Sequence, residues 1–234
     1  MSSSLASEFG VSEDAIRRDL RALAEQRLCR RVYGGALPLS PSARPMAARV
    51  DEGPENKRAL AWAALDLIQP SEFIFLDSSS TNLQLAHMLP LELDLTIATN
   101  SVDIAAALLL KRQPRLIMIG GVVNPTIGGC VDATALRAIS EMNIDRGFVG
   151  VCAVSATFGA GAIDPADAAF KRALLAASQA TVAMMSSDKL DSRAPHRIAN
   201  LEDLDALVVE HDLSSRRTRQ LMAAGATIVR AAAP

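Results

Sequence analysis

The spacing of apolar and polar positions changes at about residue 56. Before it, two short apolar stripes follow helical spacing, and Gly10 and Ser12 lie between them. A glycine is typical of a helix end and a serine of a helix N-cap, so the pattern predicts a helix, a turn and a second helix. The stripes consist of Leu5, Ala6 and Phe9, then Ile16, Leu20 and Leu23.

The next segment, "LCRRVYGGALPL", is short and partly β-like, with a turn signal at Gly34-Gly35. Two helices followed by a β-hairpin are the pattern of a winged helix. Residues 38–55 contain four prolines and no clear apolar period, which is typical of a linker. We therefore expect a winged helix-turn-helix head at 1–37, a linker at 38–55 and a second domain at 56–234.

From residue 56 onward, helical stretches alternate with short, continuously apolar runs. Continuously apolar strands indicate a sheet that is buried on both faces. The sequence therefore predicts an α/β fold with a doubly wound, mostly parallel sheet. The runs are "FIFL", "LTIAT", "RLIMI", "GFVGVCAV", "TVAMM", "LDALVVE" and "TIVRA".

Charge is distributed unevenly between these parts. The 234 residues carry a net charge of −2. Residues 1–50 hold eight Arg and five Asp or Glu, giving +3, and the remaining 16 basic and 21 acidic residues give −5. A basic head on an acidic body favours a polyanion-binding module joined to a different kind of domain.

Several classes of protein are disfavoured by the motifs. The three cysteines are scattered singly, which argues against a C-x-x-C metal or redox pair and fits a reduced cytoplasm. We see no secretory leader and no apolar run of membrane-spanning length. The isolated histidines predict no metal site. The chain contains none of the glycine motifs that bind nucleotide cofactors, so we expect no cofactor. We expect no catalytic residues.

Polar and glycine residues follow several of the predicted strands. In open α/β sheets ligands bind beyond the carboxyl ends of the strands, and hydroxyl groups at a helix N-terminus suit an anion. For a single such loop ordinary helix capping is the better explanation, and the recurrence of polar residues at several strand ends makes an anion site an equal alternative. The candidates are Asp77, Ser78, Ser79, Ser80, Thr81 and Asn82; Thr99 and Asn100; Gly120 and Gly121; and Asp188 and Lys189.

Lys171 is a further candidate, on the predicted helix after "FGAGAID". Asp167 lies four residues before it, so the two side chains share a helix face. Taken alone, this spacing favours a surface ion pair.

The head reads "LASEFGVSEDAIRRDLRALAEQRLCRRVYGGA". The second domain contains, in order, the blocks "NKRALAWAALDLI", "IFLDSSST", "TNS", "IGG", "AAFKRALL" and "SSDKL". With these motifs the chain resembles the DeoR family of bacterial transcriptional regulators: the head resembles that family's DNA-binding region, and the blocks resemble its effector domain. Family members have another helix ahead of "LASEFG", so we expect an incomplete three-helix head.

The resemblance implies a second domain similar to sugar-phosphate isomerases and CoA transferases. It also implies a homo-oligomer that binds operator DNA and responds to a phosphorylated sugar or related small anion. The strand-end residues and Lys171 then become effector contacts. The DNA-contact candidates on or near the second helix and hairpin are Ser12, Asp14, Ala15, Arg17, Arg18, Arg21, Arg30 and Arg31.

Two other functions remain open at this point. One is an isomerase or transferase on the same fold, for which Asp167 and Lys171 are a weak acid–base candidate. The other is a ligand-binding protein with a vestigial head.

Overall fold

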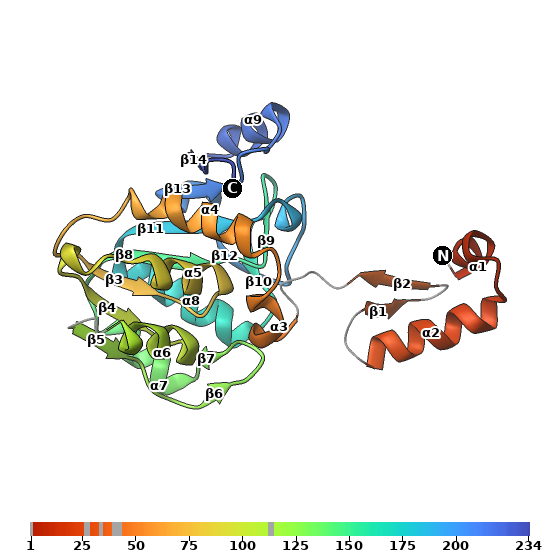
Figure 1. Ribbon diagram of the computed structural model, residues 1–234, viewed down its shortest axis with the longest axis horizontal. Coiled ribbons are helices and arrows are strands. Elements are labelled where there is room, and N and C mark those ends of the chain that lie inside the picture. The colour runs from red at the N-terminus through yellow and green to blue at the C-terminus, as the bar shows by residue number, and fades with distance from the viewer. Residues whose placement is uncertain (1, 26–28, 33–34, 39–43, 112–114) are drawn as a thin grey trace. The chain divides into compact units, whose positions relative to one another are not determined.

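The computed structural model describes residues 2–25, 29–32, 35–38, 44–111 and 115–234 (Figure 1). The chain divides into two compact units, Met1–Arg44 and Pro45–Pro234.

The first unit has the predicted order of helix, turn, helix and hairpin. Gly10 has a left-handed backbone (φ 64°), which ends the first helix and lets the N–H of Val11 donate to the carbonyl of Ala6. The hydroxyl of Ser12 accepts from the N–H of Ala15 at 3.2 Å and caps the second helix. The elements are α1 (Ser2–Phe9), α2 (Glu13–Glu25), β1 (Cys29–Val32) and β2 (Gly35–Pro38).

The hairpin is antiparallel and runs in register from Cys29 opposite Pro38 to Val32 opposite Gly35. The predicted turn at Gly34 lies outside the described residues. In α2 the apolar stripe is only partly covered within this unit, because Ile16 is buried whereas Leu23 is 39% exposed.

The second unit is built on a seven-stranded sheet in which every neighbouring pair is parallel (Figure 1). The strand order is β14-β13-β11-β8-β3-β4-β5. The fold class predicted from the sequence is thus confirmed. The strands are β3 (Phe73–Leu76), β4 (Thr96–Thr99), β5 (Arg115–Met118), β8 (Ile144–Gly150), β11 (Ser178–Met185), β13 (Ala206–Val209) and β14 (Ile228–Arg230).

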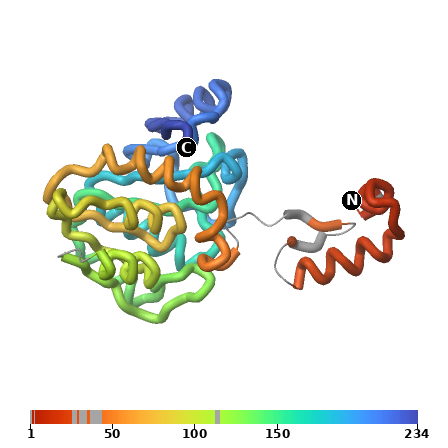
Figure 2. Tube along the Cα trace, viewed as in Figure 1, coloured from red at the N-terminus to blue at the C-terminus, as the bar shows by residue number. Residues whose placement is uncertain are grey.

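Helices cover both faces of this sheet, as the tube in Figure 2 also shows. The first four pack with Ile74, Leu76 and Phe148 on one face, and the other three pack on the opposite face. Their bounds are α3 (Met46–Val50), α4 (Pro54–Leu65), α5 (Ser80–Met88) and α6 (Val102–Leu110), then α7 (Ala133–Ser140), α8 (Pro165–Ala177) and α9 (Ser215–Ala223).

Two small antiparallel sheets were not predicted. Their strands are two to four residues long, and "GAGA" has no apolar run that the pattern could detect. The run "GFVGVCAV" is not one strand, because β8 ends at Gly150 and a new strand begins at Ala153. The sheets are β12-β10-β9, from β9 (Ala153–Ser155), β10 (Gly159–Ala162) and β12 (His196–Ala199), and β6 (Val123–Asn124) with β7 (Gly129–Cys130). The described part of this unit also contains three short 3-10 turns, at Leu91–Leu93, Ser187–Lys189 (η3) and Leu201–Asp203.

Helix α3 and the start of α4 lie inside the segment that we expected to be a linker. Met46 is only 1% exposed and belongs to the core of the second unit. Its N–H donates to the carbonyl of Thr126 at 3.0 Å. One buried apolar side chain gives no periodic signal, which is why the prolines dominated the sequence interpretation.

Candidate anion-binding site

The carboxyl ends of β3, β4 and β8 meet around Asp77, which is completely buried. Its Oδ2 accepts from the N–H of Gly150 at 2.8 Å, and its Oδ1 accepts from Nδ2 of Asn82 at 2.8 Å. A Cβ at Gly150 would lie 2.5 Å from the Cβ of Ser79, so only glycine allows the two loops to approach this closely.

Lys171 reaches into this cluster from α8. Its Nζ lies 2.8 Å from Oδ2 of Asp77 and 2.7 Å from Oδ1 of Asp167. Lys171 is 2% exposed and Asp167 6%, so the expected surface pair is wrong. The i,i+4 spacing was read correctly, but the helix face that carries it points into the protein.

Asp77, Asp167 and Lys171 form a buried trio of two carboxyl groups and one ammonium group. Burial alone would lower the pKa of Lys171, but the Asp167 and Asp77 carboxylates outweigh it and raise that pKa above its ordinary value. Burial raises the pKa of Asp167. The Lys171 ammonium opposes this rise only in part, because it is shared with Asp77. Lys171 therefore stays charged, and two carboxylates compete for it.

Helix α5 begins directly beside the trio. The Ser79 hydroxyl accepts from the N–H of Asn82 at 3.1 Å and caps the helix. The Ser78 hydroxyl is 4% exposed at the residue level and has no hydrogen-bond partner within the described part of the chain. The main-chain N–H groups of Ser80 and Thr81 open the helix and are not used by its cap. A buried donor without a partner beside a helix N-terminus suits an anion.

Thr99 and Asn100 shape the loops. The Thr99 hydroxyl donates to the carbonyl of Leu76 at 2.6 Å. Asn100 accepts from the N–H of Ser78 at 3.1 Å and donates to the carbonyl of Cys130 at 2.9 Å. Both side chains are thus bound to protein groups and position the Ser78 loop.

A group of cations lies near the trio, and the sequence interpretation missed part of it. Lys57 on α4 is 8% exposed and donates from Nζ to the carbonyl of Arg49 on α3. Burial lowers the pKa of Lys57, and the nearby Lys189 lowers it further. Burial also lowers the pKa of Lys189, with further lowering from Arg49 and Lys171. Lys57 does not follow a strand, so the strand-end rule could not find it.

Glu210 fixes this arrangement. One carboxylate oxygen accepts from Asn56 Nδ2 at 2.9 Å, and the other accepts from the N–H of Ser187 at 3.0 Å. The residue before Lys57 and a residue of η3, which carries Lys189, are therefore joined to the same side chain. We name Arg49, Lys57 and Lys189 the cation group.

Three predicted contacts lie away from the trio. Gly120 and Gly121 are exposed after β5, and a Cβ at Gly121 would meet the Asp132 carboxylate at 2.4 Å. This loop packs on the cap of α7, where Asp132 also accepts from Val122. Asp188 is exposed on η3. None of the three forms a hydrogen bond or an ion pair with the trio within the described part of the chain.

On α2, the predicted DNA contacts are solvent-exposed or half-buried. Arg17 forms ion pairs with Glu13 at 3.0 Å and Asp14 at 3.5 Å, whereas Arg18 and Arg21 are exposed and form no ion pair with any described residue. Ser12 caps the helix, and Ala15 is half-buried. Arg30 and Arg31 lie on β1.

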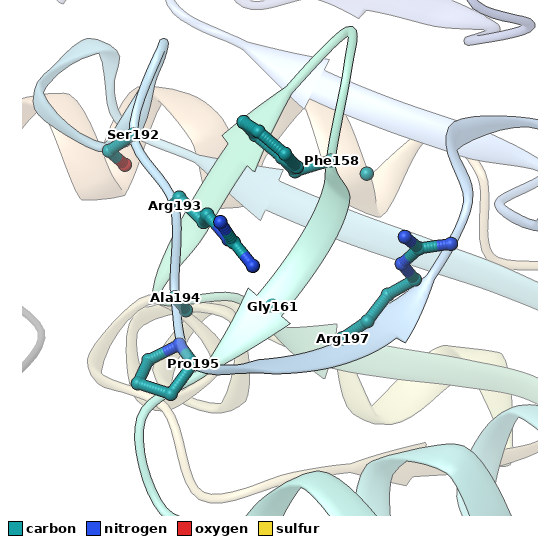
Figure 3. Close-up of a pocket in the computed structure, with 8 residues that line it drawn as sticks. Phe158, Gly161, Ser192, Arg193, Ala194, Pro195 and Arg197 are labelled. Atoms are coloured by element: carbon teal, nitrogen blue, oxygen red, sulfur yellow. The ribbon is translucent and has the colours of Figure 1, made fainter.

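A separate polar cavity of about 190 Å³ lies beside β10 and β12 (Figure 3). The guanidinium of Arg193 stands 4.7 Å from the centre of the Phe158 ring, and Arg197 also lines the cavity. No residue that we predicted as a contact belongs to its lining.

Within the described ranges, no three His, Cys, Asp or Glu side chains are grouped as a metal ion would require. No helix in those ranges combines the length and the apolar character needed to cross a membrane.

Comparison with known proteins places the chain in a family. Residues 52–211 match the family model of the DeoR C terminal sensor domain, and residues 3–41 match that of the DeoR-like helix-turn-helix domain. The glycerol-3-phosphate regulon repressor of Escherichia coli K12 is 30% identical over 207 residues, covering 88% of this chain and 82% of the relative. The HTH-type transcriptional repressor GlcR of Bacillus subtilis is 26% identical, covering 86% and 78%.

Among solved structures, ribose 5-phosphate isomerase A from Neisseria gonorrhoeae is similar with a TM-score of 0.42 and 14% identity. The match covers 59% of this chain and 54% of the isomerase, so the chain spans about half of that enzyme. The sequence matches cover both units, in the order that the structure shows. The protein belongs to the DeoR family of transcriptional regulators.

Proposed function

We propose that this protein is a repressor of carbohydrate-metabolism genes that binds operator DNA as a homo-oligomer in the cytoplasm. A phosphorylated sugar or related small anionic metabolite controls its affinity for DNA. One relative named as the glycerol-3-phosphate regulon repressor and another named as a transcriptional repressor support this role. The observation that carries the effector site is the buried, unpartnered hydroxyl of Ser78 at the start of α5.

The phosphate group binds at the N-terminus of α5 in this proposal. The Ser78 hydroxyl and the N–H groups of Ser80 and Thr81 are donors at this point, and the helix dipole adds a partial positive charge. The Thr81 hydroxyl forms no hydrogen bond with any described residue and can donate as well.

Binding of a phosphate beside the trio requires the positive charges of the cation group. The trio of two carboxylates and one ammonium is negative overall and would repel a phosphate. Lys57 and Lys189 have pKa values lowered chiefly by burial, so a bound anion would stabilise their charged forms. We propose that these two lysines supply the charge that neutralises the phosphate.

We infer that Lys57 also connects the effector site with the DNA-binding unit. Lys57 donates to the carbonyl of Arg49 in α3, the first helix after the division of the chain at Arg44. An effector that attracts the Lys57 ammonium competes with this carbonyl and changes how the C-terminus of α3 is held. We propose that α3 passes the bound state of the sensor unit to the DNA-binding unit.

The enzyme alternative has one feature in its favour, the raised pKa of Asp167, which a general base requires. However, Asp167 is bound to Lys171 at 2.7 Å, and Asp77 is bound to both Lys171 and Gly150. A base that must take a substrate proton would have to leave these bonds. We therefore favour binding without turnover, and an assay with ribose 5-phosphate tests this choice directly.

Calorimetry tests the site. We expect ribose 5-phosphate, glycerol 3-phosphate or another phosphorylated sugar to bind, and the unphosphorylated sugar to bind far more weakly. Ser78→Ala and Thr81→Ala each remove a donor, and loss of one hydrogen bond to a charged group costs about 1.5–3 kcal/mol, or roughly 10- to 150-fold in affinity. Thr134→Ala in the first turn of α7 is the matched control. Equal binding by all three variants would show that the Ser78 loop only caps α5.

A further inference from the structure

Strand β5 forms one edge of the seven-stranded sheet (Figure 1). Ile117 and Met118 are each 40% exposed. More exposed apolar residues lie on the helix that leads into β5 and on the segment that leaves it. These are Leu109 at 67%, Leu110 at 87%, Val122 at 74% and Val123 at 46%. We name the six side chains the β5 edge patch.

Edge strands of soluble proteins are commonly protected by charged side chains, prolines or bulges. In β5 the single charged residue, Arg115, is already paired with Asp94 at 2.6 Å. Strand β5 contains no proline, and its register with β4 is regular from Arg115 to Met118. Within its four residues, Arg115–Met118, this edge strand therefore has neither a proline nor a bulge, and its one charge is paired.

The free main-chain groups of β5 can be assigned from its register. The N–H of Ile119 donates to the carbonyl of Thr99 at 2.8 Å, and Thr99 lies opposite Met118. In a parallel pair this places the N–H and C=O groups of Leu116 and Met118 on the side away from β4. Leu116 and Met118, two positions apart, thus present main-chain donors and acceptors at the open edge of the sheet.

A second copy of the same strand fits this edge. In an antiparallel arrangement centred on Ile117, Leu116 of each copy lies opposite Met118 of the other. Each such pair exchanges two N–H···O bonds, so the free groups of both strands are satisfied. Ile117 then faces its own copy, where side chains approach closely. The strand carries no unpaired charge that would repel its copy.

The exposed apolar area of the patch can be compared with the area that a standard interface buries. A fully exposed large apolar side chain presents on the order of 100 Å². The exposed fractions of the β5 edge patch then amount to roughly 350 Å² per copy, and a standard interface buries about 800 Å² per partner. The patch therefore supplies somewhat under half of that area.

We propose that two copies of this chain associate through their β5 strands, paired antiparallel about a two-fold axis at Ile117, to form one continuous sheet. The proposal does not depend on the effector site, because none of the six residues belongs to the trio or to the cation group.

Cross-linking tests the register. In Ile117→Cys, the two new thiols face each other at a distance that a disulfide spans. Under mild oxidation we expect a cross-linked dimer as the main species on a non-reducing gel. The matched control is Met222→Cys on α9, because Met222 is also exposed, at 57%. Cross-linking of Ile117→Cys no greater than that of wild type and Met222→Cys would overturn the proposed pairing.

Sedimentation of the full chain provides a second readout. Ile117→Lys places like charges directly opposite each other, so the two chains should separate at this interface. We expect the sedimenting assembly of this variant to contain fewer chains than that of wild type. Met222→Lys should sediment as wild type does. A monomeric wild type, or an unchanged mass for Ile117→Lys, would refute the interface. Calorimetric titration with ribose 5-phosphate should give the same result for both lysine variants, because the effector site is separate.

Discussion

At the scale of single residues, Lys171 determines whether the buried carboxylates are tolerated. Asp77 is completely buried and Asp167 is 6% exposed, and both depend on the same ammonium group. Removing one partner of a buried charge group leaves uncompensated charge in a region of low dielectric. An exposed pair such as Arg137–Glu141 carries no such penalty, because water solvates both charges.

We therefore predict that Lys171→Met destabilises the protein by about 3–5 kcal/mol. Urea unfolding followed by circular dichroism in a phosphate-free buffer measures this. Adding Asp167→Asn to the same variant should recover part of the loss, because one unpaired charge is then removed. Arg137→Ala should cost less than about 1 kcal/mol. Similar small losses for Lys171→Met and Arg137→Ala would contradict a buried trio.

A second residue-scale prediction concerns pH. Burial lowers the pKa of Lys57 and Lys189 below the ordinary value of 10.5. Both lysines are cationic below their lowered pKa values and lose their protons as the pH rises through them. Binding of a sugar phosphate should be tightest below these values and weaken above them, before an ordinary lysine would titrate. The free energy of unfolding changes in the opposite sense and rises with pH. Burying the two charged lysines costs most below their lowered pKa values, and this cost is relieved as the pH rises towards 10.5.

Calorimetry with ribose 5-phosphate from neutral pH to 10.5 measures this dependence. Lys57→Arg should move the loss of affinity to higher pH, because a guanidinium stays charged throughout. Lys111→Arg is the control, since the pKa of Lys111 is also lowered by burial but this lysine binds the carbonyls of His87 and Leu89. The same pH profile for Lys57→Arg and wild type would exclude Lys57 from the site.

At the scale of elements, α2 is predicted to enter the major groove of DNA. Arg17 is held by Glu13 and Asp14, whereas Arg18 is exposed and forms no such pair with the described residues. Arg18→Ala should therefore weaken operator binding more than Arg17→Ala does. A contact to a base should cost about 1–3 kcal/mol, and a phosphate contact should weaken all sequences alike.

Fluorescence anisotropy with duplexes selected from random DNA by the full chain measures these effects. Arg216→Ala, at an exposed arginine of α9, provides the control for loss of one positive charge. If Arg216→Ala and Arg18→Ala weaken binding equally, the contribution of Arg18 is general charge and α2 is not the recognition helix.

The alternation of elements could be predicted because it depends on local spacing. The apolar runs gave the main strands, and Gly10 and Ser12 gave the turn of the head. The strand-end rule found Asp77 and Ser78, since parallel strands bring their carboxyl ends together. Lys57 and Met46 escaped because their burial depends on packing between segments that are distant in sequence. The role of Glu210, which binds Asn56 and Ser187, could not be seen for the same reason.

At the scale of the whole molecule, one short segment of the chain connects the two units. The head ends at Arg44, and α3 begins at Met46 with its first side chain buried in the sensor core. The carbonyl of Arg49 near the other end of α3 is bound by Lys57 of the cation group. A ligand can change DNA affinity only if it prefers one arrangement of these parts, and typical couplings are about 1–3 kcal/mol.

The most direct test is the affinity of the full chain for its selected operator with and without a saturating sugar phosphate. For wild type we predict a change of roughly 5- to 150-fold. Thr81→Ala should bind operator without effector as wild type does, and at an effector concentration that only just saturates wild type it should lose most of that change. A response of Thr81→Ala equal to that of wild type at this concentration would contradict control of DNA affinity by an anion bound at the N-terminus of α5.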